Sequence, residues 1–387
     1  MIAHDKNLLN NLSLIKEANS LQTGGFISKE QNIIIKKNLS SFKRHDNILI
    51  RSGFFLLGSF LYISICGAFS LMGIDSGQNF WNICFYFFAI IGFVGSHILA
   101  NQKYYGHGLD DAFNLGALLN LAIAMGISTN SYEIIIAVFI AIASLLIYLR
   151  FIHLPSLIVF CLAFSAVLFY GMFEFGTIGK TILPFVVMLF SAGLYFFTKK
   201  IINSLRKNFY YKGVLLANNF CLILFYLSCN YLIVRELSIM LLGNKIHSGK
   251  DIPFAFFFLA FTVIVPIVYL IQALKTKNRI MLWISFLAVG FSIYTIRFYY
   301  SVLPVEIALT LGGLILFTIV FFLIKKLKDK ENGLTFKPDR INNSNAFLNA
   351  ELLIVASQFG LKPEAPIESP MEFGGGGFSG GGSGSSY

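Results

Sequence analysis

The residues of this chain that could do chemistry are polar side chains inside or beside long apolar segments. Seven stand out in the sequence: Asp110, Asp111, Glu174, Asn218, Asn219, Arg297 and Glu306. An ionisable group inside a membrane is costly, so each of the charged ones is a functional candidate. Each residue also has a purely structural interpretation, and the sequence leaves the functional and the structural interpretation open.

Asp110 and Asp111 directly precede the apolar segment 112–129, with His107 nearby. Acidic residues are favourable at a helix N-terminus, where the helix dipole is positive. The same pair could instead form an entry site for a cation or a proton. Glu174 ends another apolar segment and has the same two interpretations, interfacial or functional.

Two further pairs of polar residues lie within or between apolar segments. Arg297 and Glu306 flank the short turn FYYSVLP, so we expect an ion pair across a helical hairpin. Asn218 and Asn219 lie well inside the segment 212–234. Buried asparagines often make interhelical hydrogen bonds, and a substrate-binding polar patch is the alternative.

Known catalytic and metal-binding motifs are absent from the sequence. It contains no HExxH, no GxSxG, no Walker loop and no GxGxxG between a strand and a helix. The five cysteines all lie in apolar segments, without a CxxC pair or a histidine at metal-ligand spacing. We therefore expect no catalytic residue, no cofactor and no metal, and the sequence leans against an enzyme.

Composition indicates a membrane protein. Hydrophobic residues make up 56% of the chain and charged residues 13%, against roughly 25% charged in soluble domains. We therefore expect an all-α, polytopic transmembrane bundle. The net charge of +11 suits an anionic inner leaflet. The basic residues are not interleaved with aromatic residues on a soluble face, so we expect the lipid bilayer as partner and no nucleic acid.

Ten apolar segments are long enough to cross a bilayer, which takes about 20 residues. They are 52–73, 79–100, 112–129, 132–150, 154–174, 178–198, 212–234, 252–274, 280–299 and 302–324. The third is short and contains Asn114 and Asn120, so it either crosses fully or is re-entrant and buried.

The basic residues alternate with these segments. If each segment crosses once, 25 of the 30 Lys and Arg residues lie on the side of both termini. Cytoplasmic loops are enriched in Lys and Arg. The pattern therefore predicts a membrane protein with both ends in the cytoplasm.

The two ends differ from the predicted bundle, 51–324. Residues 1–50 read as a cytoplasmic helical hairpin, with Leu8, Leu12 and Ile15 on one face and Gly24–Gly25 at the turn. Ser28 and Gln31 match a capping box for the second helix. Such a hairpin is too small for a core of its own, so we expect it to dock on the bundle, lipid headgroups or a partner.

The C-terminal end begins as a basic segment, 325–362, with one short helix predicted at 346–360. Residues 363–387 are first Pro-rich and then Gly/Ser-rich, which is typical of disordered chain. This tail is either without function, an expression scar, or a peptide held out to a partner or protease. In the last case Phe373, Phe378 and Tyr387 would make the contacts.

Two short motifs resemble those of a bacterial family of predicted membrane proteins without a defined function. GGFISKEQ, before the second helix of the hairpin, is similar to that family's G-hydrophobic-I-S/T-x-E-Q motif, and RFYYSV (297–302) is similar to its late R-F/Y-Y-Y hairpin. The resemblance implies a bacterial inner membrane and a multi-span bundle, with no activity to carry over. The tail separately resembles the Gly-rich C-termini of membrane proteins with a periplasmic TPM domain, although this chain has no such domain.

Two functional hypotheses follow from the sequence. The first is a membrane scaffold or accessory component that acts through its cytoplasmic ends. The second is a transporter or channel for a small or lipophilic solute, with Asp110, Asp111, Asn218, Asn219 and Glu306 along its path. A lipid-modifying enzyme is a third, weaker hypothesis, because no cluster of polar residues marks one leaflet.

Overall fold

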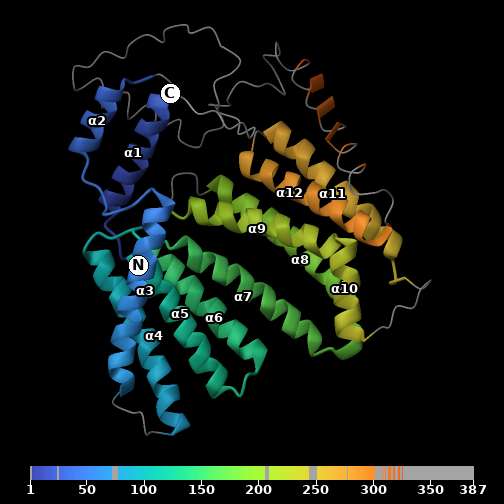
Figure 1. The fold of residues 1–387 in the computed structure, drawn as a ribbon, viewed down its shortest axis with the longest axis horizontal. Coiled ribbons are helices and arrows are strands. Elements are labelled where there is room, and N and C mark those ends of the chain that lie inside the picture. Colours follow the sequence, from blue (N-terminus) through green and yellow to red (C-terminus); the bar gives the residue numbers. More distant parts are fainter. Residues whose placement is uncertain are drawn as a thin grey trace. The chain divides into compact units, whose positions relative to one another are not determined.

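The computed structural model describes residues 2–23, 26–71, 77–204, 209–243, 251–276 and 278–300, and single positions between 307 and 325. Within these ranges the chain is all-helical, with twelve helices and no strand (Figure 1). It divides into two units. The bundle unit contains residues 1–9 and 42–344, and the hairpin unit contains 10–41 and 345–387.

Nine helices of the described part are long and apolar enough to cross a membrane. They are α3 (Ile48–Ser70), α4 (Gln78–Asn101), α5 (Leu109–Ser128), α6 (Glu133–Phe151), α7 (Leu154–Phe173), α8 (Gly176–Ser204), α9 (Tyr211–Cys229), α11 (Ala255–Thr276) and α12 (Arg279–Tyr300). The chain is thus an integral membrane protein, and these helices correspond to the first nine predicted segments. Most of the tenth, 302–324, lies outside the described residues.

Helix α5 corresponds to the segment that the sequence left ambiguous. It is a continuous helix of 20 residues and packs between α3, α4 and α6. Its amides are used internally: Asn114 donates to the Asp110 carbonyl at 2.9 Å, and Asn120 donates to the Tyr62 hydroxyl at 2.9 Å. Its low hydropathy therefore reflects an interior position with polar contacts, and its length is sufficient to cross.

Small residues bring α4 and α5 close together. A Cβ placed on Gly92 would lie 2.8 Å from the Cβ of Ala117, and one on Gly95 would lie 2.4 Å from the Phe113 ring. Neighbouring membrane helices commonly approach at such residues, where dispersion contacts replace the hydrophobic effect. The α4–α5 pair is therefore a closely packed part of the bundle unit.

The predicted seventh span, 212–234, is wrong at its end, because the helix breaks at Asn230. Helix α9 stops at Cys229, and a separate helix, α10 (Tyr231–Leu242), follows at an angle to it (Figure 1). The fully buried Asn230 side chain accepts the N–H groups of Leu232 and Ile233. This N-cap starts a new helix inside an apolar run, and α10 has only 12 residues.

The hairpin unit contains most of α1 (Lys6–Thr23) and all of α2 (Lys29–Asn38). The predicted capping box is confirmed. The Gln31 N–H donates to the Ser28 hydroxyl at 3.2 Å, and the Ser28 N–H donates to the Gln31 side chain at 2.7 Å.

A small apolar cluster joins the two helices of the hairpin. Its buried members are Ala18, Leu21, Ile27 and Ile35. The predicted face of the first helix is buried only in part, since Leu8 is buried while Leu12 and Ile15 are partly exposed.

Gly108, in the turn between α4 and α5, allows a first test of the fold. We expect Gly108→Ala to lower the free energy of unfolding by roughly 2 kcal/mol. Its φ of +110° is strained for other residues, and a Cβ there would lie 2.3 Å from the Arg51 carbonyl oxygen. The measurement is unfolding of the purified protein in detergent.

Gly67→Ala is the matched control, since nothing lies within 4 Å of a Cβ at that position. It should leave stability unchanged or slightly raise it, because Ala favours a helix over Gly. Equal stability of the two variants would show that Gly108 is not under this constraint.

Candidate functional site

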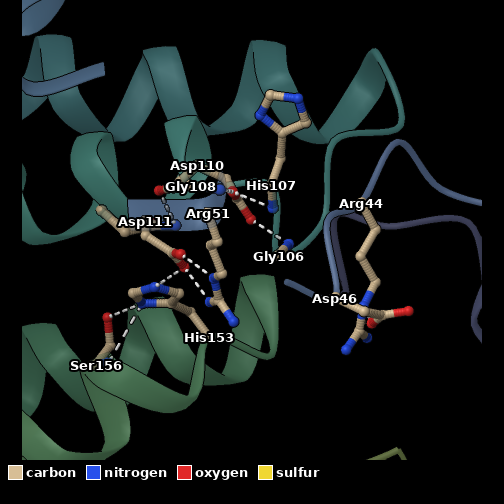
Figure 2. Close-up of polar contacts among 11 residues, drawn as sticks. Arg44, Asp46, Arg51, Gly106, His107, Gly108, Asp110, Asp111, His153 and Ser156 are labelled. Carbon is tan, nitrogen blue, oxygen red and sulfur yellow. Dashed lines mark hydrogen bonds and ion pairs between the residues drawn. The ribbon is translucent and has the colours of Figure 1, made fainter. Parts of the chain in front are cut away.

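Asp110 and Asp111 are both buried at the start of α5, where their carboxylates take different partners (Figure 2). The Asp110 carboxylate accepts the backbone N–H groups of Gly106, His107 and Gly108, at 2.6, 3.0 and 3.0 Å. A turn whose successive N–H groups converge on one anion needs left-handed residues. Gly106 and Gly108 supply them, at φ +65° and +110°. Asp110 therefore holds the α4–α5 turn in place.

Asp111 joins three parts of the bundle unit. Arg51, in the first turn of α3, donates to it twice, from Nε at 2.6 Å and from Nη2 at 2.8 Å. His153, between α6 and α7, lies 2.9 Å away through Nε2. The Asp111 side chain is 9% exposed and that of Arg51 36%. Paired donors of this kind are what a buried carboxylate requires.

His153 is also the N-cap of α7. Its Nδ1 accepts the Ser156 N–H at 3.3 Å and lies 2.7 Å from the Ser156 hydroxyl. Because Nδ1 is an acceptor, we assign the proton of the neutral ring to Nε2, which donates to Asp111. Figure 2 shows Arg51 and His153 both pointing at Asp111, while the His107 ring points away from it.

The order Asp111–His153–Ser156 invites comparison with a nucleophilic triad. In hydrolases the serine hydroxyl faces the substrate, next to donors that stabilise an oxyanion. Here Ser156 has no exposed surface and lies in the first turn of α7, and Asp111 is also paired with Arg51. The contacts of Asp111 with Arg51 and His153, called the Asp111 clamp below, suit a structural link between helices better than acyl transfer.

The turn before His153 is strained. Ile152 has φ +53°, a left-handed conformation that is unusual for a β-branched residue. Its N–H donates to the Tyr148 carbonyl at 2.7 Å and closes the end of α6. This turn lies directly before the residue that binds Asp111, so the strain is found where the clamp is built.

The N-terminal segment completes the end of α6. The Ala3 N–H donates to the Arg150 carbonyl at 2.8 Å, and His4 Nε2 lies 3.1 Å from the Phe151 carbonyl. The last carbonyls of a helix have no partner inside the helix, and these contacts supply two. His4 is buried, at 6% exposed. Burial lowers the pKa of His4 below 6.5, although the charge of Asp110 opposes this shift.

The other flank of the hairpin is attached to the same part of the bundle unit. The Lys43 N–H donates to the Lys103 carbonyl at 2.9 Å, and the Lys43 ammonium lies 4.5 Å from the Tyr104 ring centre. The rings of Phe42 and Tyr105 lie 5.6 and 4.9 Å from the His4 ring. The segments directly before and after the hairpin, which contain His4 and Lys43, are thus both bound near the α4–α5 turn and the end of α6.

The structure does not bring the other predicted residues close to Asp110 and Asp111. Asn218 donates to α8, to the Tyr195 carbonyl at 3.1 Å and the Thr198 hydroxyl at 2.8 Å. Asn219 is buried beside it on α9. Glu174 is exposed at the C-cap of α7.

Of the remaining predicted residues, the structure describes Arg297. Arg297 is in the last turn of α12, but Glu306 lies outside the described residues, so their pairing stays a prediction. Phe373, Phe378 and Tyr387 also lie outside them. The described residues contain no group of three or more His, Cys, Asp or Glu side chains placed to hold a metal ion.

A second polar cluster, at α10 and α12, escaped the sequence analysis. The Arg235 guanidinium lies 4.4 Å from the Tyr299 ring centre, and its Nη1 donates to the Tyr231 hydroxyl at 3.1 Å. Tyr231 donates to Asp251 at 2.7 Å, and Tyr299 to Glu236 at 2.7 Å. Arg51 and His153 were missed as well. The positive charge of Arg51 in the first turn of an apolar helix was the one usable signal.

Comparison with known proteins gives no relative for this arrangement. The chain matches no profile of a known protein family, no curated protein and no solved structure.

The contacts of the Asp111 clamp predict that replacing Asp111 destabilises the protein. We expect Asp111→Asn to lower the free energy of unfolding by about 2 kcal/mol, since it leaves Arg51 with a neutral partner in a partly buried site. Unfolding in a detergent titration measures this. In a double-mutant cycle, Arg51→Gln should cost little more once Asp111→Asn is present.

Arg44→Gln is the control for the clamp. Its partner Asp46 is 85% exposed, so the loss should be at most about 0.5 kcal/mol. Similar losses for Arg44→Gln and Asp111→Asn would contradict the role given to Asp111.

His4 predicts a pH dependence. Its pKa is lower in the folded protein than the usual 6.5, so the fold favours the neutral ring. This stabilisation is complete above pH 6.5 and declines as the pH falls below 6.5 towards the lowered pKa. We expect faster amide hydrogen exchange at residues 2–9 at pH 5 than at pH 7.5, after correction for intrinsic rates.

His4→Gln keeps a donor for the Phe151 carbonyl but cannot titrate in this range. Its exchange at residues 2–9 should therefore show no such change between the two pH values. An equal change in the wild-type protein and in His4→Gln would assign the pH dependence to another group.

Proposed function

We propose that this protein is a membrane scaffold or accessory component that acts through its cytoplasmic ends, with the hairpin α1–α2 as one docking element. The attachment of both flanks of the hairpin carries this proposal. Ala3 and His4 bind the end of α6, and Lys43 binds the α4–α5 turn. Fixing both ends of a segment reduces the entropy that it loses on binding a partner.

The distribution of charge supports both ends on the cytoplasmic side of a bacterial inner membrane. Of the 30 Lys and Arg residues, 25 fall on one side when ten crossings are counted. Helix α10 is too short to add a crossing. The count therefore rests on the nine described spanning helices and on the predicted segment 302–324. The GGFISKEQ resemblance to bacterial membrane proteins agrees with this placement.

The contacts of the polar residues favour a scaffold over a transporter. Asp110 is occupied by backbone N–H groups, Asp111 by Arg51 and His153, and Asn218 by α8. A solute path needs polar groups that can exchange protein partners for solute. A transporter or channel remains the second candidate because the Oδ1 atoms of Asn114 and Asn219 are buried without a hydrogen-bond partner among the described residues.

Replacement of the hairpin tests the scaffold. Residues 10–41 are exchanged for a flexible linker, which keeps the His4 and Lys43 attachments. A second variant lacks residues 363–387. We expect one or both to lose specific cross-linked partners in intact cells while membrane insertion and thermal stability stay as in the wild-type protein.

The variant Asn219→Leu tests the alternative function. For a scaffold it should leave the cross-linked partners unchanged. If both end variants keep their cross-linked partners and Asn219→Leu alters the solute permeability of proteoliposomes, the scaffold proposal is wrong. The transporter then becomes the better hypothesis.

A further inference from the structure

Helix α2 has one exposed face with an apolar centre and a basic rim. Ile33 is 55% exposed. Lys29, Lys36 and Lys37 are exposed around it, at three and four residues' distance along the helix. Residues at these spacings lie on one side of an α-helix. None of the three lysines forms an ion pair with a described residue.

The opposite face fixes how α2 is rotated. Ile35 is buried in the cluster with Ala18 and Leu21. Asn32 is 2% exposed and donates to the side chains of Asn19, at 3.0 Å, and Gln22. The hairpin therefore cannot turn Ile33 inward without giving up these contacts, so the basic face is a fixed property of the unit.

We infer that this face, with Ile33 at its centre and Lys29, Lys36 and Lys37 around it, binds an anionic phospholipid surface. This inference rests on the proposed function, in which the hairpin is a docking element. Positive side chains near an anionic leaflet each add favourable energy, and an apolar residue among them enters the headgroup boundary. Glu30, also exposed on α2, lies three residues before Ile33, as far from it along the helix as Lys36, so the face carries three positive charges and one negative charge.

A helix of ten residues is too short to stay bound to a membrane through these contacts alone. The chain, however, tethers it to a membrane-spanning helix. Residues 39–47 join α2 to the membrane-spanning helix α3. Nine residues reach at most roughly 30 Å when fully extended. Such a short tether keeps the local concentration of headgroups high, so weak contacts suffice.

The experiment uses the full-length protein with Ile33→Cys carrying an environment-sensitive fluorophore. The five native cysteines are buried, which favours selective labelling. The protein is reconstituted in vesicles of phosphatidylcholine alone and of an equimolar mixture with phosphatidylglycerol. We expect a shift of the emission to shorter wavelength only in the mixture, and loss of that shift at high salt.

Lys29→Gln/Lys36→Gln/Lys37→Gln should abolish the shift. Each lysine contributes about fivefold to the equilibrium between the docked and released hairpin, so the triple change lowers it by about two orders of magnitude. Lys199→Gln/Lys200→Gln removes exposed charge from α8 and should leave the shift intact. A label at Asn10→Cys, exposed on α1, should report no shift.

Three results would overturn the inference: a shift that does not depend on phosphatidylglycerol, one that survives the triple substitution, or one that the α8 substitutions remove equally. A shift that requires an added protein would also overturn it. The vesicles contain no partner protein, whereas the scaffold is tested by cross-linking in cells, so the two experiments distinguish a failure of the lipid inference from a failure of the scaffold.

Discussion

A carboxylate removed from water must be surrounded by donors, and this requirement at Asp110 and Asp111 shapes one end of the bundle unit. Asp110 accepts three N–H groups of the α4–α5 turn, in which Gly106 and Gly108 have positive φ. Asp111 draws in Arg51 and His153. The starts of α3 and α5 and the turn before α7 are thereby held together at one point.

The same requirement applies to backbone groups where helices end. Where these groups are buried away from water, side chains and neighbouring segments must satisfy them. Ala3 and His4 cover carbonyls at the end of α6. At the break between α9 and α10, Asn230 accepts two N–H groups, and Thr262 accepts that of Tyr231. Helix ends rather than helix centres therefore hold most of the polar chemistry described above.

These constraints explain which features could be predicted. Long apolar segments reveal spanning helices because lipid selects for length and composition. The Ser28–Gln31 capping box could be predicted because both partners lie within one turn. The break at Asn230 could not, since an asparagine in an apolar run also suits an interhelical hydrogen bond.

The clamp depends on distant parts of the chain. Arg51 and Asp111 are 60 residues apart, and Asp111 and His153 are 42 apart. No periodicity links residues at such separations, so the sequence identified Asp111 as a candidate but not its partners. A single sequence offers a charge near a helix end as a signal, and it cannot say which opposite charge packs against it.

The hairpin attachments and the acidic pair belong to one connected set of contacts. The His4 ring contacts Phe42 on one flank of the hairpin and Phe151 at the end of α6. Its neighbour Tyr105 belongs to the turn whose next residue, Gly106, donates to Asp110. A positive charge on His4 would therefore act on both flanks together, because one buried ring joins them. The two attachments should therefore loosen as a unit.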